Sequence, residues 1–253
     1  QYDFTTKPAD GKTVANSAPN AALGAATVQN ASDGLWSGES LTLSGGAKDG
    51  SGDWVKLPEN ILAKATSATV TMEVKADATM LGNFHFMWNI GNNSSDTEYF
   101  FTSLNCGSGR NPLVGIKANG AEQLVQSESC AVTADRWMSV TARISNGQAR
   151  LYIDGRRVAS GNVSATPASI ADQSLNTIGR SPWPDTLFKG SVANFRVYDS
   201  ALTEEQIARI SNADAAIHAD ELTGSVLNGL DVPSSVDAEY IALPTAGGTV
   251  EWS

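Results

Sequence analysis

The sequence predicts an all-β fold, an antiparallel β-sandwich of the jelly-roll type with a short helix after its last main strand. Short runs of strand-forming residues follow one another along the 253-residue chain, and turns rich in glycine or asparagine separate most of them. Barely any segment has the apolar spacing of an amphipathic helix. Many short strands with almost no helix are typical of sandwiches and jelly rolls.

Turn-forming pairs mark the boundaries between expected strands. The Asn-Gly pair at 146–147 and the Asp-Gly pair at 154–155 supply the positive φ angles that tight hairpins need. In chain order, the expected strands are residues 2–4, 40–43, 53–57, 68–75, 84–90, 99–104, 113–118, 137–145, 148–153, 175–178 and 191–198.

The last expected strand has a clear alternation of side chains. In residues 191–198, Val192 and Asn194 fall on one face, and Ala193 and Phe195 fall on the other. This period of two predicts a half-buried strand.

A loop and a helix flank this strand. Residues 181–185 cannot form a central strand, because two prolines surround Trp183. After the strand, Thr203 and Gln206 have the spacing of a capping box. A helix is therefore expected to begin there and to continue through Ile210.

The charge and the apolar pattern exclude two classes of partner. The formal net charge is −10, so the chain lacks the basic face that nucleic acid or an acidic membrane surface would require. No apolar run approaches the roughly 20 residues that cross a bilayer. Because the sequence starts at Gln1 without an initiator methionine or a signal peptide, we expect a mature or trimmed fragment.

The only two cysteines, Cys106 and Cys130, are expected to form a disulfide. Both lie in polar surroundings rich in glycine and serine, and neither has the partners of a Cys/His zinc site. Two unrelated buried thiols are the alternative. A disulfide would contribute about 3 kcal/mol on the chain-entropy model and would indicate a secreted or cell-surface protein.

Four motifs in order carry a resemblance to a known family. They are residues 2–4, residues 40–55, the Trp-initiated strand and Leu-Tyr-Ile-Asp-Gly hairpin of 136–155, and the strand–loop–strand–helix of 176–210. Together they resemble the laminin-G-like, concanavalin A-like jelly roll of secreted bacterial glycosidases, over about residues 1–210. The cysteine-bearing region 92–130 departs from the usual pattern of that family.

The sequence changes character after residue 210. Residues 211–229 are expected to be a linker, although 211–220 also fits a helix tail. Residues 230–253 resemble the opening of a bacterial immunoglobulin-like domain, which needs about 100 residues to close. The parent polypeptide is therefore expected to be longer.

No catalytic constellation is visible, so we expect a binding module and not an enzyme. Retaining glycosidases need a pair of positioned carboxylates, and Asp96 with Glu98 lacks the third partner of the usual sandwich-glucanase arrangement. His85 alternates with aromatic residues that favour a packing role, and His218 lies in the tail.

Aromatic residues next to charged groups indicate a glycan site. A sugar presents an apolar C–H face and a rim of hydroxyls, so its sites combine an aromatic platform with polar side chains. The expected ligand-binding residues are Trp88, Tyr99, Arg110, Arg180, Trp183 and Asp185.

Each aromatic candidate also has a structural alternative. Trp183 could fold over the sandwich edge, and Trp88 shares a strand face with Phe84 and Phe86 that is more typical of a core. The other tryptophans with a strand-like pattern are expected in the core: Trp36, Trp54 and Trp137.

The family resemblance also implies one Ca²⁺ ion between the first strand, a loop after the second and the last strand. Calcium takes six to eight oxygen ligands, mostly carboxylate and carbonyl. The matching suppliers are Asp3 or Asn16, then Asp49 and Asp53, then Asp199. Asp199 could instead anchor the turn that follows it.

The resemblance implies a non-catalytic carbohydrate-binding module of a secreted multidomain glycosidase that acts on plant or host glycans. Its partners would be an oligosaccharide or polysaccharide and the catalytic domain of the same polypeptide. The alternative is a structural spacer or adhesin module that packs on a catalytic domain or binds a host protein.

Overall fold

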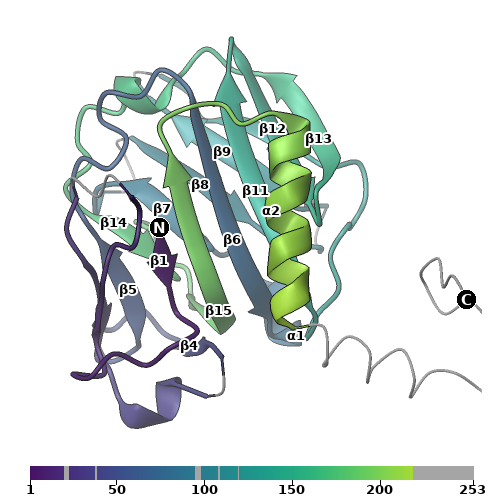
Figure 1. Ribbon diagram of the computed structural model, residues 1–253. Coiled ribbons are helices and arrows are strands. Elements are labelled where there is room, and N and C mark those ends of the chain that lie inside the picture. Colours follow the sequence, from purple (N-terminus) through teal and green to yellow (C-terminus); the bar gives the residue numbers. More distant parts are fainter. Residues whose placement is uncertain (20–22, 38, 95–97, 108, 119, 219–253) are drawn as a thin grey trace, which may run out of the picture.

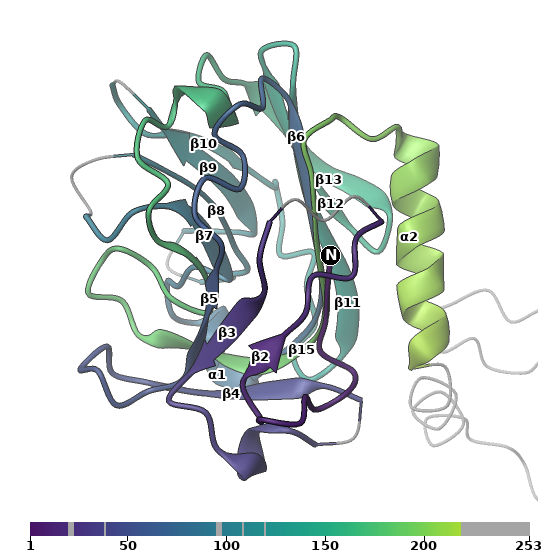
Figure 2. The ribbon, with the colours of Figure 1, turned by 60° about the vertical axis from the view of Figure 1, so that its left-hand side comes forward.

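The computed structural model of the chain describes residues 1–19, 23–37, 39–94, 98–107, 109–118 and 120–218. Within them, two antiparallel sheets pack face to face as a sandwich, and one helix lies outside one of the sheets (Figures 1 and 2). The predicted all-β sandwich with a late helix is therefore confirmed.

The described strands form a seven-stranded and an eight-stranded sheet. The first sheet contains β1 (Tyr2–Asp3), β4 (Leu41–Gly46), β6 (Ala68–Ala76), β11 (Trp137–Ser145), β12 (Gln148–Ile153), β13 (Arg156–Asn162) and β15 (Leu187–Tyr198). The second contains β2 (Thr13–Val14), β3 (Ala26–Gln29), β5 (Trp54–Leu57), β7 (Trp88–Gly91), β8 (Tyr99–Ser103), β9 (Leu113–Lys117), β10 (Gln123–Gln126) and β14 (Asn176–Ile178).

Strand order places distant parts of the sequence side by side. The seven-stranded sheet runs β1-β15-β6-β11-β12-β13, with β4 also paired to β15, and the eight-stranded sheet runs β10-β9-β8-β7-β14-β5-β3-β2. Short helical segments join the strands: η1 (Asp33–Leu35), α1 (Ala78–Leu81) and η2 (Pro167–Ser169).

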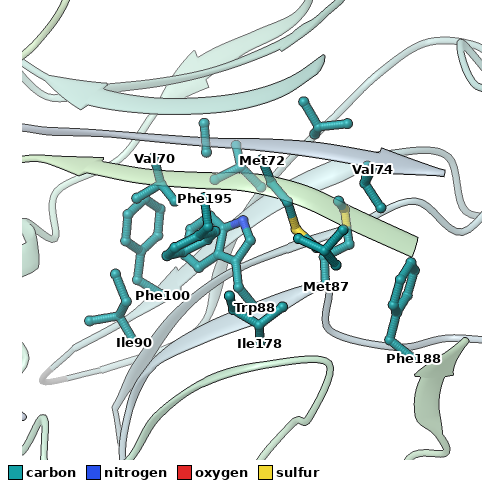
Figure 3. Packing of buried hydrophobic residues seen from close by; sticks show 14 of the residues in the cluster. Val70, Met72, Val74, Met87, Trp88, Ile90, Phe100, Ile178, Phe188 and Phe195 are labelled. Carbon is teal, nitrogen blue, oxygen red and sulfur yellow. The ribbon is translucent and has the colours of Figure 1, made fainter. Parts of the chain in front are cut away.

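The core lies between the sheets because strand side chains alternate between their two faces. On β6, Val70, Met72 and Val74 are fully buried against the opposite sheet (Figure 3). On β7, the ring of Trp88 lies 4.9 Å from that of Phe100, centroid to centroid. These large side chains fill the space between the layers.

A β-bulge changes the predicted alternation of the last strand. The register of β15 against β6 shifts between Val192 and Asn194. Val192 and Phe195 therefore both belong to the core, whereas the prediction put them on opposite faces. The extra residue of a bulge switches the face of the side chains that follow it.

Helix α2 (Glu204–Ile217) begins as predicted and continues further than predicted. The Thr203 hydroxyl accepts the Gln206 amide N–H, and the Gln206 side chain accepts the Thr203 N–H, which completes the capping box. Residues 211–217 are helical, which agrees with the helix-tail alternative. The rest of the expected linker after residue 218 and the segment 230–253 lie outside the described residues.

Polar contacts hold α2 against the outer face of the seven-stranded sheet (Figure 2). The buried Asp214 carboxylate lies 2.8 Å from the Arg196 guanidinium, and His218 Nε2 lies 3.1 Å from the buried Glu73 carboxylate. No helix within the described ranges is long and apolar enough to cross a membrane.

The predicted Cys106–Cys130 disulfide is present, with 5.3 Å between the Cα atoms. It joins the loop after β8 to the segment after β10. Strands β2, β3, β10 and β13 were not among the expected strands, because their sequences carry weak strand signals.

Candidate functional site

An aromatic cluster covers part of the eight-stranded sheet on the face turned away from the core. It consists of Phe84, Phe86, Tyr99, Phe101 and Trp183, packed with Leu113. Phe86 and Phe101 stack with 3.6 Å between ring centroids, and Phe84 meets both edge-on. The alternation of β8 explains the placement, since Tyr99 and Phe101 point outward where Phe100 points into the core.

Gly115 on β9 provides the space for this cluster. A Cβ atom at this position would lie 2.3 Å from Cε1 of Phe101. The ring of Phe101 can therefore lie flat over the strand because residue 115 has no side chain. Any larger residue there would displace the stacked pair.

Tyr99 connects the aromatic cluster to the loop that carries Trp183. Its side chain is buried, its ring meets that of Trp183 edge-on at 6.5 Å, and its hydroxyl donates to Glu122 Oε1 at 2.8 Å. Burial, followed by the hydrogen bond to Glu122, raises the pKa of Tyr99. The phenol thus stays neutral and holds its donor toward the carboxylate.

The loop 180–186 is fixed by buried and half-buried polar contacts. Lys48 Nζ donates to the carbonyl oxygens of Pro182 at 2.9 Å and Trp183 at 2.8 Å. The Ser181 hydroxyl donates to Asp185 Oδ2 at 2.8 Å. Since the anchors of Trp183 are main-chain atoms, its half-buried side chain is presented by a loop of defined shape.

A pocket of about 280 Å³ lies beside this loop, and we call it the Trp54 pocket. Within it, the Arg180 guanidinium lies 4.9 Å from the centroid of the Trp54 ring, within range of a cation–π contact. Arg180 also donates to Asn93 Oδ1 at 2.8 Å. The lining residues are Gln29, Asn30, Lys48, Gly50, Gly52, Trp54, Arg180 and Leu187.

The charges at this pocket perturb one another. Burial, followed by the Arg180 charge, lowers the pKa of Lys48 to about 8, although Asp185 opposes both effects. Burial raises the pKa of Asp185 and lowers that of Arg180. At neutral pH Lys48 and Arg180 are therefore both cations in a partly desolvated site.

One wall of the Trp54 pocket is a turn held by Asn30. The Asn30 side-chain amide donates to the carbonyl oxygens of Gly50 at 2.9 Å and Gly52 at 2.7 Å. Asp49 accepts the N–H and hydroxyl of Ser51, and Asp53 accepts the N–H of Ser44 at 2.8 Å. The two aspartates thus stabilise the turn and the strand pair next to it.

Five of the six predicted glycan-binding residues lie around this outer face, and Trp88 does not. Tyr99, Trp183, Asp185 and Arg180 follow one another as described above, and the exposed Arg110 stacks on Phe84 at 4.8 Å.

The prediction that Trp88 binds a ligand was wrong, because Trp88 is fully buried in the core between the sheets. On β7 it points to the inner face, so it cannot contact a ligand at the surface (Figure 3). The structural alternative for this residue was the right one.

Two site residues, Trp54 and Lys48, were missed. Trp54 was expected in the core, but it is half-buried and lines the pocket. A signal existed, because Val55 and Leu57 are the apolar positions of β5 and Lys56 shares the other face with Trp54. Lys48 had no such signal, since it precedes the strand in a turn.

The five predicted calcium ligands do not form one ligand set in the structure. Asp3 accepts the N–H and hydroxyl of Thr5, and Asp49 and Asp53 are engaged as described above. Asn16 and the exposed Asp199 line a different pocket of about 500 Å³. Over the described ranges no three His, Cys, Asp or Glu side chains come together as a metal site. Calcium binding stays a prediction.

Each described titratable group that was considered for catalysis has a packing or hydrogen-bonding partner. His85 is fully buried, its Nδ1 lies 2.8 Å from the Asn83 carbonyl oxygen, and burial lowers its pKa to about 4. His218 stacks on Trp137 at 3.9 Å, Glu98 accepts the N–H of Ala171, and Asp96 lies outside the described residues.

The comparisons with known proteins concern the same part of the chain. A family model named Laminin_G_3 and described as the concanavalin A-like lectin/glucanases superfamily matches residues 49–208. Among curated proteins, no significant match was found.

Solved structures with a similar fold include domain 4 of AbnA, an extracellular GH43 arabinanase from Geobacillus stearothermophilus, in complex with arabinotriose. It is 19% identical with a TM-score of 0.58, over 83% of this chain and 99% of that one. The CBM40 of a Ruminococcus gnavus IT-sialidase, bound to α2,3-sialyllactose, is 17% identical with a TM-score of 0.52, over 68% and 96% of the two chains. At these identities the structures show a shared fold.

Proposed function

Because the chain belongs to the concanavalin A-like lectin/glucanases superfamily, we propose that it is a non-catalytic carbohydrate-binding module of a secreted multidomain glycosidase. The similar folds of an arabinanase domain in complex with arabinotriose and a sialidase CBM40 bound to sialyllactose support this role. The disulfide supports an extracellular location, since such bonds persist in oxidising compartments.

The observation that carries the proposal is the juxtaposition of Trp183 with the Trp54 pocket. The half-buried ring of Trp183 offers an apolar surface for the C–H face of a sugar. Next to it, Lys48 and Arg180 offer charged donors to hydroxyl or carboxylate oxygens. An apolar platform beside a few fixed polar groups is the usual composition of a small-molecule site.

The proposed role is to hold a catalytic domain of the same polypeptide near a plant or host polysaccharide. Modest affinity at a single site suffices, because tethering raises the effective concentration of the enzyme at its substrate. A structural Ca²⁺ belongs to this proposal only through the family resemblance. Its test is a melting curve with and without chelator, in which an unchanged Tm and a metal-free elemental analysis would exclude it.

The experiment that tests the proposal is a glycan array on the purified protein, followed by calorimetry with the glycan that it selects. We expect binding that Arg180→Ala weakens at least about tenfold, the loss of a charge-assisted contact. Arg156→Ala is the matched control, since Arg156 is an exposed arginine on the other sheet. A protein that is folded but binds no glycan would instead support the spacer or adhesin alternative.

A further inference from the structure

The Trp54 pocket is cationic in a protein whose formal net charge is −10. Lys48 and Arg180 both line it, and no carboxylate of the described residues does. Asp185 acts on Lys48 from the neighbouring loop, and its carboxylate accepts the Ser181 hydroxyl. Asp49 and Asp53 belong to the turn that forms one wall, where they accept hydrogen bonds from Ser51 and Ser44. The charged side chains that line the pocket are therefore both cations.

Both cations retain unused donors. Lys48 has three N–H donors, and the carbonyl oxygens of Pro182 and Trp183 accept two of them. Arg180 has five donors, and Asn93 accepts from one guanidinium nitrogen. The donors that remain belong to two side chains lining the same pocket, so one anionic group could bind both.

Trp54, the aromatic residue of the pocket, positions the Arg180 guanidinium. The Arg180 guanidinium lies over the Trp54 ring at 4.9 Å, so it occupies the face that a neutral sugar would otherwise stack on. The planar fork of N–H donors of a guanidinium matches the two oxygens of a carboxylate. The pocket is therefore better suited to an acid group than to a bare pyranose face.

We propose that the Trp54 pocket binds a sugar carboxylate, so that the ligand is an acidic glycan containing a hexuronic or a nonulosonic acid. This inference rests on the proposed glycan binding and adds the chemical class of the ligand. The carboxylate binds between Lys48 and Arg180, and the adjoining sugar extends toward the half-buried Trp183.

The test compares acidic ligands with their neutral counterparts by calorimetry. The hexuronic pair is trigalacturonic acid and its methyl ester, and the nonulosonic pair is 3′-sialyllactose and lactose. We expect the acid of at least one pair to bind about tenfold or more tightly than its neutral counterpart, and added salt to reduce that difference. The pair that shows the difference identifies the source of the carboxylate.

Two variants connect the difference to the pocket. Arg180→Gln should reduce the preference for the acid at least about tenfold, because it weakens the binding of the acid more than that of its neutral counterpart. Lys48→Met removes the other charge and also two loop contacts, so its melting curve is recorded alongside. Arg156→Gln is the control for an arginine elsewhere on the surface.

The outcomes separate this inference from the proposed function. Equal affinity for acidic and neutral ligands, or a preference that Arg180→Gln does not reduce, would overturn the carboxylate site while glycan binding stands. Binding of neutral glycans alone on an array would do the same. Failure of the folded protein to bind any glycan would overturn the proposed function itself.

Discussion

The Arg180 guanidinium lies 4.9 Å above the Trp54 ring, although the two residues are 126 positions apart in the sequence. Strand β5 carries Trp54 and lies beside β14, after which the chain reaches Arg180, so the sheet pairing brings them together. The Trp54 ring therefore supports the positive charge of Arg180. Lys48 lines the same pocket, and its lowered pKa makes the charge of the pocket depend on pH.

The affinity for an acidic glycan should fall as the pH rises through about 8. Burial lowers the pKa of Lys48 to about 8, so Lys48 is charged below this pH and loses its charge above it. A bound carboxylate favours the charged form and would raise that pKa in the complex. Calorimetry between pH 6.5 and 9.5 measures the effect. Lys48→Arg should remove it, because arginine keeps its charge throughout; an equal decline in this variant would contradict the assignment.

The stability of the protein should depend on Glu73 between pH 4.5 and 7. Glu73 is buried beneath α2, where its carboxylate accepts Asn194 Nδ2 at 2.7 Å and faces His218 at 3.1 Å. Burial raises the pKa of Glu73 from 4.5 to about 7. The folded state thus holds this proton more tightly than the unfolded chain, and the stability that it contributes declines as the pH rises from about 4.5 to about 7.

Glu73→Gln removes this contribution, because glutamine cannot ionise. The free energy of unfolding of the variant should gain on that of the original protein as the pH rises, by up to about 3 kcal/mol over this range. Urea unfolding at a series of pH values measures both. His85, whose buried ring has a pKa near 4, adds a slope of opposite sign that is common to both proteins and cancels in the difference. Parallel curves would show that Glu73 does not titrate in this range.

Removal of the disulfide should lower stability without removing the binding site. Cys106 and Cys130 are 24 positions apart, and closing a loop of this size contributes about 3 kcal/mol on the chain-entropy model. The free energy of unfolding of the Cys106→Ser/Cys130→Ser variant should be lower by that amount, so the variant should unfold at a lower urea concentration. Alkylation of the unfolded original protein without reductant is the control, and reaction of two thiols would contradict the disulfide.

The sequence predicted the layers of the fold better than it predicted the site. The strand-forming run of β6, the turn pairs around β12 and the capping box of α2 are local signals, and each was sufficient for its element. The bulge at Val192 was not visible, because it depends on the register with β6 and not on the local pattern. Position along a strand likewise does not show which sheet face Trp88 occupies. For Trp54 the alternation of β5 carried the signal, and the prediction overlooked it.

Five site residues were predicted because they are loop or strand-end residues with charged neighbours. Their grouping depends on pairings between distant strands, which one sequence does not reveal. Lys48 illustrates this: its role is to hold the carbonyl oxygens of Pro182 and Trp183, more than 130 positions away. Its contribution becomes visible only when the loop lies beside the turn.

Trp183→Ala should weaken glycan binding about tenfold or more while the fold and the loop are retained. The Trp183 ring is half-buried at the border of the aromatic cluster, where it meets Tyr99 edge-on at 6.5 Å, a contact worth about 1 kcal/mol, and its side chain hydrogen-bonds Tyr99. Lys48 holds this loop through the main-chain oxygens of residues 182 and 183, which alanine keeps. The melting temperature should therefore fall by only a few degrees, whereas the ligand loses the apolar surface on which its sugar ring packs.

Calorimetry with the selected glycan and a melting curve are measured on the same sample. Trp183→Phe should restore part of the affinity, because it returns an aromatic face without the indole N–H. Full affinity in the alanine variant would place the binding surface elsewhere, and loss of the fold would show that Trp183 is a packing residue.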